Sequence, residues 1–92
     1  MQPTVYIGID VSKARLDVAT AAPAPVRQYP NTTRGTQRLV TWLHSLPGCM
    51  AVIEAGSYMQ RLEDALAGGS VGYAKVNPRQ VRDFARAHGI LA

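Results

Sequence analysis

Short apolar runs separated by turn residues fill the first third of the chain, and this pattern predicts strands. Residues 4–10 are nearly all apolar, whereas 14–19 and 26–29 alternate apolar and polar side chains, as half-buried strands do. Val11-Ser12-Lys13 is a short connector, and 21–25 is a Pro/Ala-rich link. We therefore expect three strands in an antiparallel meander.

The period of the apolar residues then changes to that of helices. Thr33 or Thr36 is available as N-cap of the first helix, and Gly68-Gly69 ends the second. Continuous apolar runs predict further strands at 49–54 and 71–76. The predicted apolar faces are Leu39, Trp42, Leu43 and Leu46 in the first helix, and Tyr58, Met59, Leu62, Ala65 and Leu66 in the second.

A last helix is predicted after the fifth strand, with Asn77 as N-cap and Pro78 at the first helical position. The element order is then β-β-β-α-β-α-β-α, and crossovers through helices make the later strands parallel to their neighbours. This is an α/β fold with a mixed sheet, in the topology of the ribonuclease H-like nucleases. The apolar face of the last helix is Val81, Phe84, Ala85 and His88.

Two carboxylates stand where apolar runs end, Asp10 after the first run and Glu54 after the fourth. If these strands are parallel neighbours, the two acids face each other at one edge of the sheet, where open sheets usually place their sites. Oxygen ligands of this kind suit Mg²⁺ or Mn²⁺. Two acids are too few for a two-metal site, so further carboxylates or a substrate phosphate would have to contribute. Alternatively, Asp10 starts a turn and Glu54 caps the following helix.

The charge of +4 from ten basic and six acidic residues is uneven along the 92-residue chain, which is the size of one domain. On the last helix Arg79, Arg82 and Arg86 project to one side, which suits contact with a sugar-phosphate backbone. Lys13, with Ser12, could touch a phosphate. A solvated surface is the other interpretation of these cations, and Asp17, Glu63 and Asp64 are expected to be solvated.

Membrane and disulfide chemistry are not indicated by the composition. The apolar runs are far shorter than the roughly 20 residues that a membrane span needs, and the N-terminus lacks the pattern of a secretion signal. We expect a soluble, cytoplasmic protein. The single Cys49 cannot form an internal disulfide and is expected to be a small buried side chain.

Four segments together resemble the N-terminal half of insertion-sequence transposases with a DEDD catalytic tetrad, relatives of the Piv/MooV DNA invertases. The resemblance covers essentially the whole chain. The segments are Tyr6-Ile7-Gly8-Ile9-Asp10-Val11-Ser12-Lys13, Leu16-Asp17-Val18-Ala19, Ile53-Glu54-Ala55 and Val76-Asn77-Pro78-Arg79-Gln80-Val81-Arg82-Asp83-Phe84-Ala85-Arg86-Ala87.

The resemblance implies that residues 1–92 are the N-terminal part of a RuvC-like catalytic domain that binds Mg²⁺ or Mn²⁺ and cuts and rejoins DNA. By this match Asp10 is the first acid of the tetrad and Glu54 the second. In the family the last two aspartates follow a segment matching the one that ends at Ala92, and a further domain carries a catalytic serine. The resemblance also implies a homo-oligomer, in some members a guide RNA encoded by the element, and an inactive fragment when these 92 residues stand alone.

One departure lies beside the second acid. Relatives have one more residue between the Glu-Ala pair and the following aromatic than Glu54-Ala55-Gly56-Ser57-Tyr58 provides. Two other classes of protein stay open. A non-catalytic nucleic-acid-binding module would use the basic residues alone, and a fragment of an actin-like or sugar-kinase-like ATPase would need a glycine near Ser12, which this connector lacks.

Overall fold

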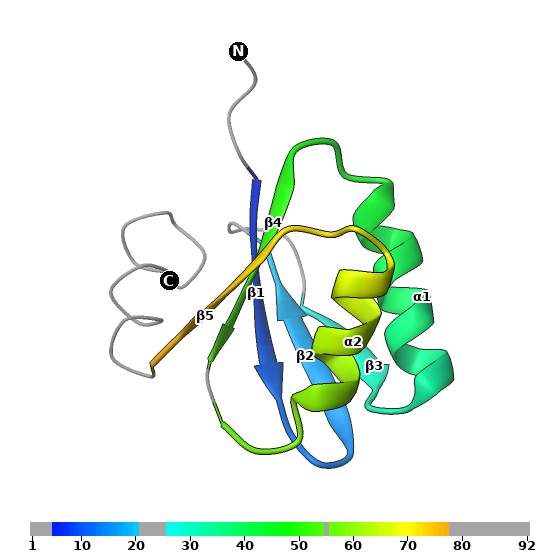
Figure 1. The fold of residues 1–92 in the computed structure, drawn as a ribbon, viewed down its shortest axis with the longest axis vertical. Helices are drawn as coiled ribbons and strands as arrows, with labels where there is room; N and C mark the ends of the chain where they lie inside the picture. Colours follow the sequence, from blue (N-terminus) through cyan, green and yellow to red (C-terminus); the bar gives the residue numbers. More distant parts are fainter. Residues whose placement is uncertain (1–4, 21–25, 55, 78–92) are drawn as a thin grey trace.

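A five-stranded mixed sheet carries two helices on one of its faces (Figure 1). The computed structural model describes residues 5–20, 26–54 and 56–77. The predicted last helix, with Arg79, Arg82 and Arg86, lies outside these ranges. The elements are β1 (Val5–Val11), β2 (Arg15–Ala19), β3 (Arg27–Pro30), α1 (Thr33–His44), β4 (Cys49–Glu54), α2 (Gln60–Gly68) and β5 (Tyr73–Val76).

The strands lie in the order β3-β2-β1-β4-β5, with β1 in the centre. The pairs β1–β2 and β2–β3 are antiparallel, which confirms the predicted meander. The pairs β1–β4 and β4–β5 are parallel, as helical crossovers require. The condition on which the acidic site depends is therefore met, because β1 and β4 are parallel neighbours.

The hydrophobic core lies between the sheet and the two helices. Along β1, Ile7 and Ile9 are buried, while Gly8 is half-buried and Asp10 is exposed, so alternate residues point to opposite faces. The helices contribute the predicted apolar faces, with one exception described below. The fully buried leucines and isoleucines of this core are Ile7, Leu16, Leu39, Leu43, Ile53, Leu62 and Leu66.

Helix α1 begins one residue earlier than predicted, because Thr32 and neither Thr33 nor Thr36 is its N-cap. Thr32 has extended backbone, and its Oγ1 accepts a hydrogen bond from the Gly35 amide at 2.9 Å. The Thr36 side chain is buried instead, and its hydroxyl donates to the carbonyls of Thr32 and Thr33. Three threonines in five positions gave the sequence pattern no way to separate these roles.

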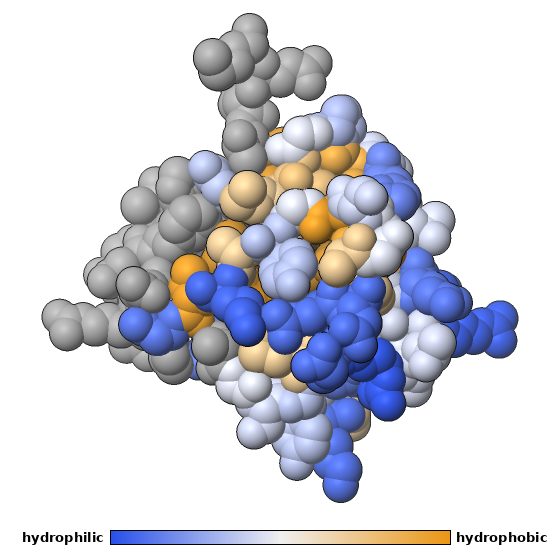
Figure 2. Space-filling model, in the orientation of Figure 1, coloured by the Kyte–Doolittle hydropathy of each residue, from blue (hydrophilic) through white to orange (hydrophobic). Residues whose placement is uncertain are grey.

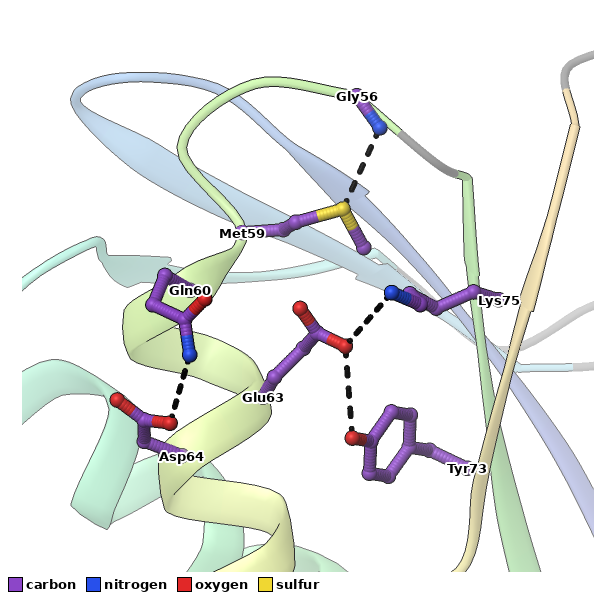
Figure 3. A network of polar contacts seen from close by, with 7 residues as sticks. All are labelled: Gly56, Met59, Gln60, Glu63, Asp64, Tyr73 and Lys75. Carbon is purple, nitrogen blue, oxygen red and sulfur yellow. Dashed lines mark hydrogen bonds and ion pairs between the residues drawn. The ribbon is translucent and has the colours of Figure 1, made fainter.

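Tyr58 is not part of the core, although its spacing placed it on the apolar face of α2. The helix starts two residues later, at Gln60, and Tyr58 has φ 66° with its side chain 57% exposed. Met59 is buried beneath the loop that precedes α2. Its Sδ accepts a hydrogen bond from the Gly56 amide at 3.3 Å (Figure 3). Tyr58 is thus exposed in the loop that follows β4.

Glu63 ties α2 to β5 and is not solvated as expected. Its Oε1 lies 3.2 Å from Lys75 Nζ and accepts from the Tyr73 hydroxyl at 3.4 Å (Figure 3). One turn away, Gln60 donates to Asp64 along the exposed side of α2. Both acids of this helix therefore have partners. No helix in residues 5–20, 26–54 and 56–77 is long and apolar enough to cross a membrane.

Gly35 allows α1 to approach the end of β3 closely. A Cβ atom at this position would lie 1.9 Å from the carbonyl oxygen of Pro30, whereas a Cβ at Gly68 would meet nothing within 4 Å. We expect Gly35→Ala to lower the free energy of unfolding by about 3 kcal/mol, since overpacking against backbone forces strand and helix apart. Gly68→Ala, the control in α2, should raise stability by about 0.5–1 kcal/mol. Urea unfolding of both variants checks this, and equal midpoints would contradict the close approach.

Candidate functional site

Asp10 and Glu54 lie side by side on the face of the sheet that α1 and α2 leave uncovered. The register pairs Ile9 with Ile53, so the next residue of each parallel strand is one of the two acids. Both follow a core residue and therefore point to the opposite face. Neighbouring strands are about 4.8 Å apart. Asp10 is exposed and Glu54 is half-buried.

The acidic pair continues into a row of polar residues across the sheet. Asp17 of β2 pairs directly with Asp10, and Gln28 of β3 pairs with Asp17. Asp17 is not the solvated side chain that its sequence context predicted. Its Oδ1 lies 3.5 Å from Arg15 Nε, and this oxygen is buried without a hydrogen-bond partner among the described residues. Asp17 is therefore paired with Arg15, a cation of its own strand.

Asp10 and Glu54 have no such cation among the described residues. In the part of the chain that the structure describes, ion pairs form only between Arg15 and Asp17 and between Lys75 and Glu63. Two adjacent carboxylates with no cation repel each other, and oxygen donors in this arrangement fit Mg²⁺ or Mn²⁺. No group of three or more His, Cys, Asp or Glu side chains that could hold an ion occurs in residues 5–20, 26–54 and 56–77. The pair supplies two ligands at most.

Asn31 holds together the two loops that follow the acids, a role that no sequence pattern indicates. Its buried side chain donates from Nδ2 to the carbonyl of Ser12, at 2.8 Å, and to that of Tyr58, at 3.1 Å. Ser12 lies two residues after Asp10, and Tyr58 four residues after Glu54. Arg61 closes the arrangement by donating from Nη1 to the Asn31 carbonyl at 2.5 Å. A single amide thus fixes the loop after β1 against the loop after β4.

Ser12 and Lys13, predicted together as phosphate contacts, have different surroundings. The Ser12 hydroxyl belongs to the hairpin turn, accepting from the Arg15 amide at 3.2 Å and donating to the Arg15 carbonyl at 2.9 Å. Lys13 is exposed at the tip and lines a surface pocket together with Tyr58 and Arg61. In Figure 2, hydrophilic residues cover α2 and the edge of the sheet near the connection of β1 to β2. Lys13 remains available to a phosphate, whereas the Ser12 hydroxyl is already occupied.

Cys49 lies at the start of β4, away from this edge. It is half-buried, and its Sγ donates to the carbonyl of Leu43 at 3.4 Å. Burial raises the pKa of the thiol, which keeps it protonated near neutral pH. This agrees with the predicted packing role and gives the cysteine no part in the chemistry of the acids.

Comparison with solved structures identifies the fold. RuvC of Thermus thermophilus superposes with a TM-score of 0.61 at 16% sequence identity, over 97% of this chain and 71% of the RuvC chain. The chain has the ribonuclease H-like fold of RuvC. No protein-family model matches the chain, and no curated protein matches it in sequence. The resemblance to DEDD transposases accordingly stays a prediction.

The clamp formed by Asn31 can be tested by unfolding. Asn31→Ala removes the hydrogen bonds to the Ser12 and Tyr58 carbonyls, and we expect a loss of about 2 kcal/mol, since one such bond contributes about 0.5–1.5 kcal/mol to stability. Gln37→Ala, on the exposed side of α1, is the control and should stay within about 0.5 kcal/mol of the wild type. Urea unfolding of the two variants measures both. Equal stability of Asn31→Ala and Gln37→Ala would show that the loops do not depend on this amide.

Proposed function

We propose that this chain is part of the catalytic domain of a metal-dependent DNA recombinase, a transposase of the DEDD type, that cleaves and rejoins phosphodiester bonds. The observation that carries the proposal is the adjacent, unbalanced pair Asp10 and Glu54 at the ends of two parallel strands. The RuvC-like fold supports a nucleic-acid substrate. DNA is the proposed partner, with a guide RNA and a second copy of the protein as further expected partners.

In this proposal Asp10 and Glu54 hold a divalent cation, Mg²⁺ or Mn²⁺, on the face of the sheet opposite α1 and α2. The cation would supply positive charge for the scissile phosphate and the attacking oxygen. The protein's own part is to keep the two carboxylates rigid, which the strands do, and to leave them unpaired. Arg15 supports this role indirectly, because it occupies Asp17 and not the two proposed ligands.

A non-catalytic nucleic-acid-binding module of the same fold is the second candidate. It is favoured by one observation, namely that residues 5–20, 26–54 and 56–77 bring only two candidate ligands together without a third. Such a module would bind nucleic acid through its cations, with an affinity that falls with salt and does not depend on metal. Metal binding by the acidic pair therefore separates the two functions.

We expect Mn²⁺ to bind the 92-residue chain weakly and to lose more than about tenfold in affinity in Asp10→Asn and in Glu54→Gln, since even residues that only support metal ligands contribute about 10- to 100-fold. Both substitutions remove a charge at nearly constant size. Asp64→Asn, on the exposed side of α2, is the matched control and should bind as the wild type does. Isothermal titration gives the affinities. Identical heats for all four proteins would remove the acidic pair from any metal site and leave the binding module.

A further inference from the structure

A surface pocket of about 520 Å³ lies beside the loops that follow the two acids, within the size range of ligand sites. Lys13 comes from the connection of β1 to β2, three residues after Asp10. The other side is formed by the start of α2 and the loop before it. The pocket is lined by Lys13, Asn31, Tyr58, Gln60 and Arg61.

Among the described residues, the pocket is lined by two cations and by no acid. Glu63 of α2 pairs with Lys75, whereas Asp64 accepts a hydrogen bond from Gln60, keeps its negative charge and lines a neighbouring pocket with Arg61. Neither Lys13 nor Arg61 forms an ion pair with any residue of the described ranges. Two cations, one on the β1–β2 connection and one in the first turn of α2, line the same pocket and therefore favour an anion there.

Arg61 is held in a fixed orientation. Its Nη1 donates to the Asn31 carbonyl, and the Asn31 side-chain oxygen lies 3.5 Å from the same nitrogen. A guanidinium has five N–H donors in a planar fork, so anchoring one nitrogen leaves the others directed and available. This geometry suits a phosphate, which accepts paired hydrogen bonds from arginine.

Tyr58 supplies an aromatic surface beside the two cations. Its φ of 66° is rare for a bulky residue, and it persists because Asn31 holds the Tyr58 carbonyl. The side chain is more than half exposed, although a large aromatic residue would gain by burial. An exposed ring next to basic groups is the arrangement with which proteins stack the bases of single strands.

We propose that the Lys13–Tyr58–Arg61 pocket binds one nucleotide of a single nucleic-acid strand, with its phosphate on Lys13 and Arg61 and its base on Tyr58. The strand would continue over the edge of the sheet toward Asp10 and Glu54. This inference rests on the nucleic-acid substrate of the proposed function and does not depend on metal. An acidic peptide would use the cations but has no need of the stacking ring.

Fluorescence anisotropy with labelled single-stranded DNA and RNA of one sequence, in EDTA, tests the pocket. We expect Lys13→Gln and Arg61→Gln each to weaken binding and to reduce the slope of log affinity against log salt by up to about 0.7, the value for one phosphate contact on a single strand, since both cations contact the same phosphate. Tyr58→Ala should weaken binding at least about fivefold at an unchanged slope, because stacking carries no charge. Tyr58→Phe should bind as the wild type does.

Arg38→Gln is the matched control, since it removes one positive charge from the exposed side of α1 outside the pocket. If Arg61→Gln unfolds, Lys13→Gln decides, because the Lys13 side chain forms no ion pair or hydrogen bond with the described residues that its loss would disturb. Binding by both DNA and RNA supports recognition of the shared sugar-phosphate backbone, and binding by one of them supports that strand alone. Pocket variants that match Arg38→Gln in affinity and salt slope would overturn the inference.

Failure of the pocket and failure of the metal site give different results. Asp10→Asn should leave strand binding in EDTA unchanged or slightly stronger, since it removes a negative charge near the path of the strand. Loss of Mn²⁺ binding in Asp10→Asn together with unaffected strand binding in the pocket variants would keep the proposed function and reject the pocket. Normal Mn²⁺ binding in Asp10→Asn with weakened strand binding in Arg61→Gln would keep the pocket and reject the metal site.

Discussion

The parallel pairing of β1 with β4 is the constraint on which the candidate site depends. Residues of parallel neighbours advance together, so the pairing of Val5 with Cys49 fixes where both strands end. A shift of one residue would turn Asp10 or Glu54 into the core, at the cost of burying a charge. The same hydrophobic alternation that builds the core therefore also aligns the two acids. Stability and site geometry have one origin here.

The loops beyond these strands need a separate interaction to hold them together, because backbone pairing stops at the strand ends. Asn31 provides it from a third segment, directly after β3. Its buried amide binds the carbonyls of Ser12 and Tyr58, which are 19 and 27 residues away in sequence. Hydrogen-bonded polar groups in a partly buried position favour one arrangement of the loops, since any other arrangement leaves a donor or acceptor unpaired. The clamp thus keeps Lys13 and Tyr58 at one pocket.

Local pattern predicted the elements well where one rule decides. Alternation of apolar residues is enough for the meander, and a helical crossover is enough for the parallel direction. The sequence placed the acids together only on the condition that β4 lies beside β1, and the structure meets this condition. Helical spacing wrongly placed Tyr58 in the core. The chain before α2 forms a loop, in which the Gly56 amide donates to the Met59 sulfur, and the helix starts only at Gln60. Spacing could not find Asn31, whose partners are all distant in sequence. An asparagine after a strand looks the same whether it is a turn residue or a clamp.

Charge distribution explains why the candidate site is limited to β1 and β4 and does not extend along the whole polar row. Three acids stand on neighbouring strands, and three adjacent negative charges would destabilise the sheet. Arg15 balances Asp17 from the same strand, two residues away and on the same face. Asp10 and Glu54 are left as the pair whose repulsion an external cation would relieve. Among the described residues, the cations Lys13 and Arg61 line the pocket and form no ion pair with these acids. The negative pair Asp10 and Glu54 and the positive pair Lys13 and Arg61 are thus separate. The first would suit a metal that binds a phosphate, and the second would suit the backbone of a nucleic-acid strand.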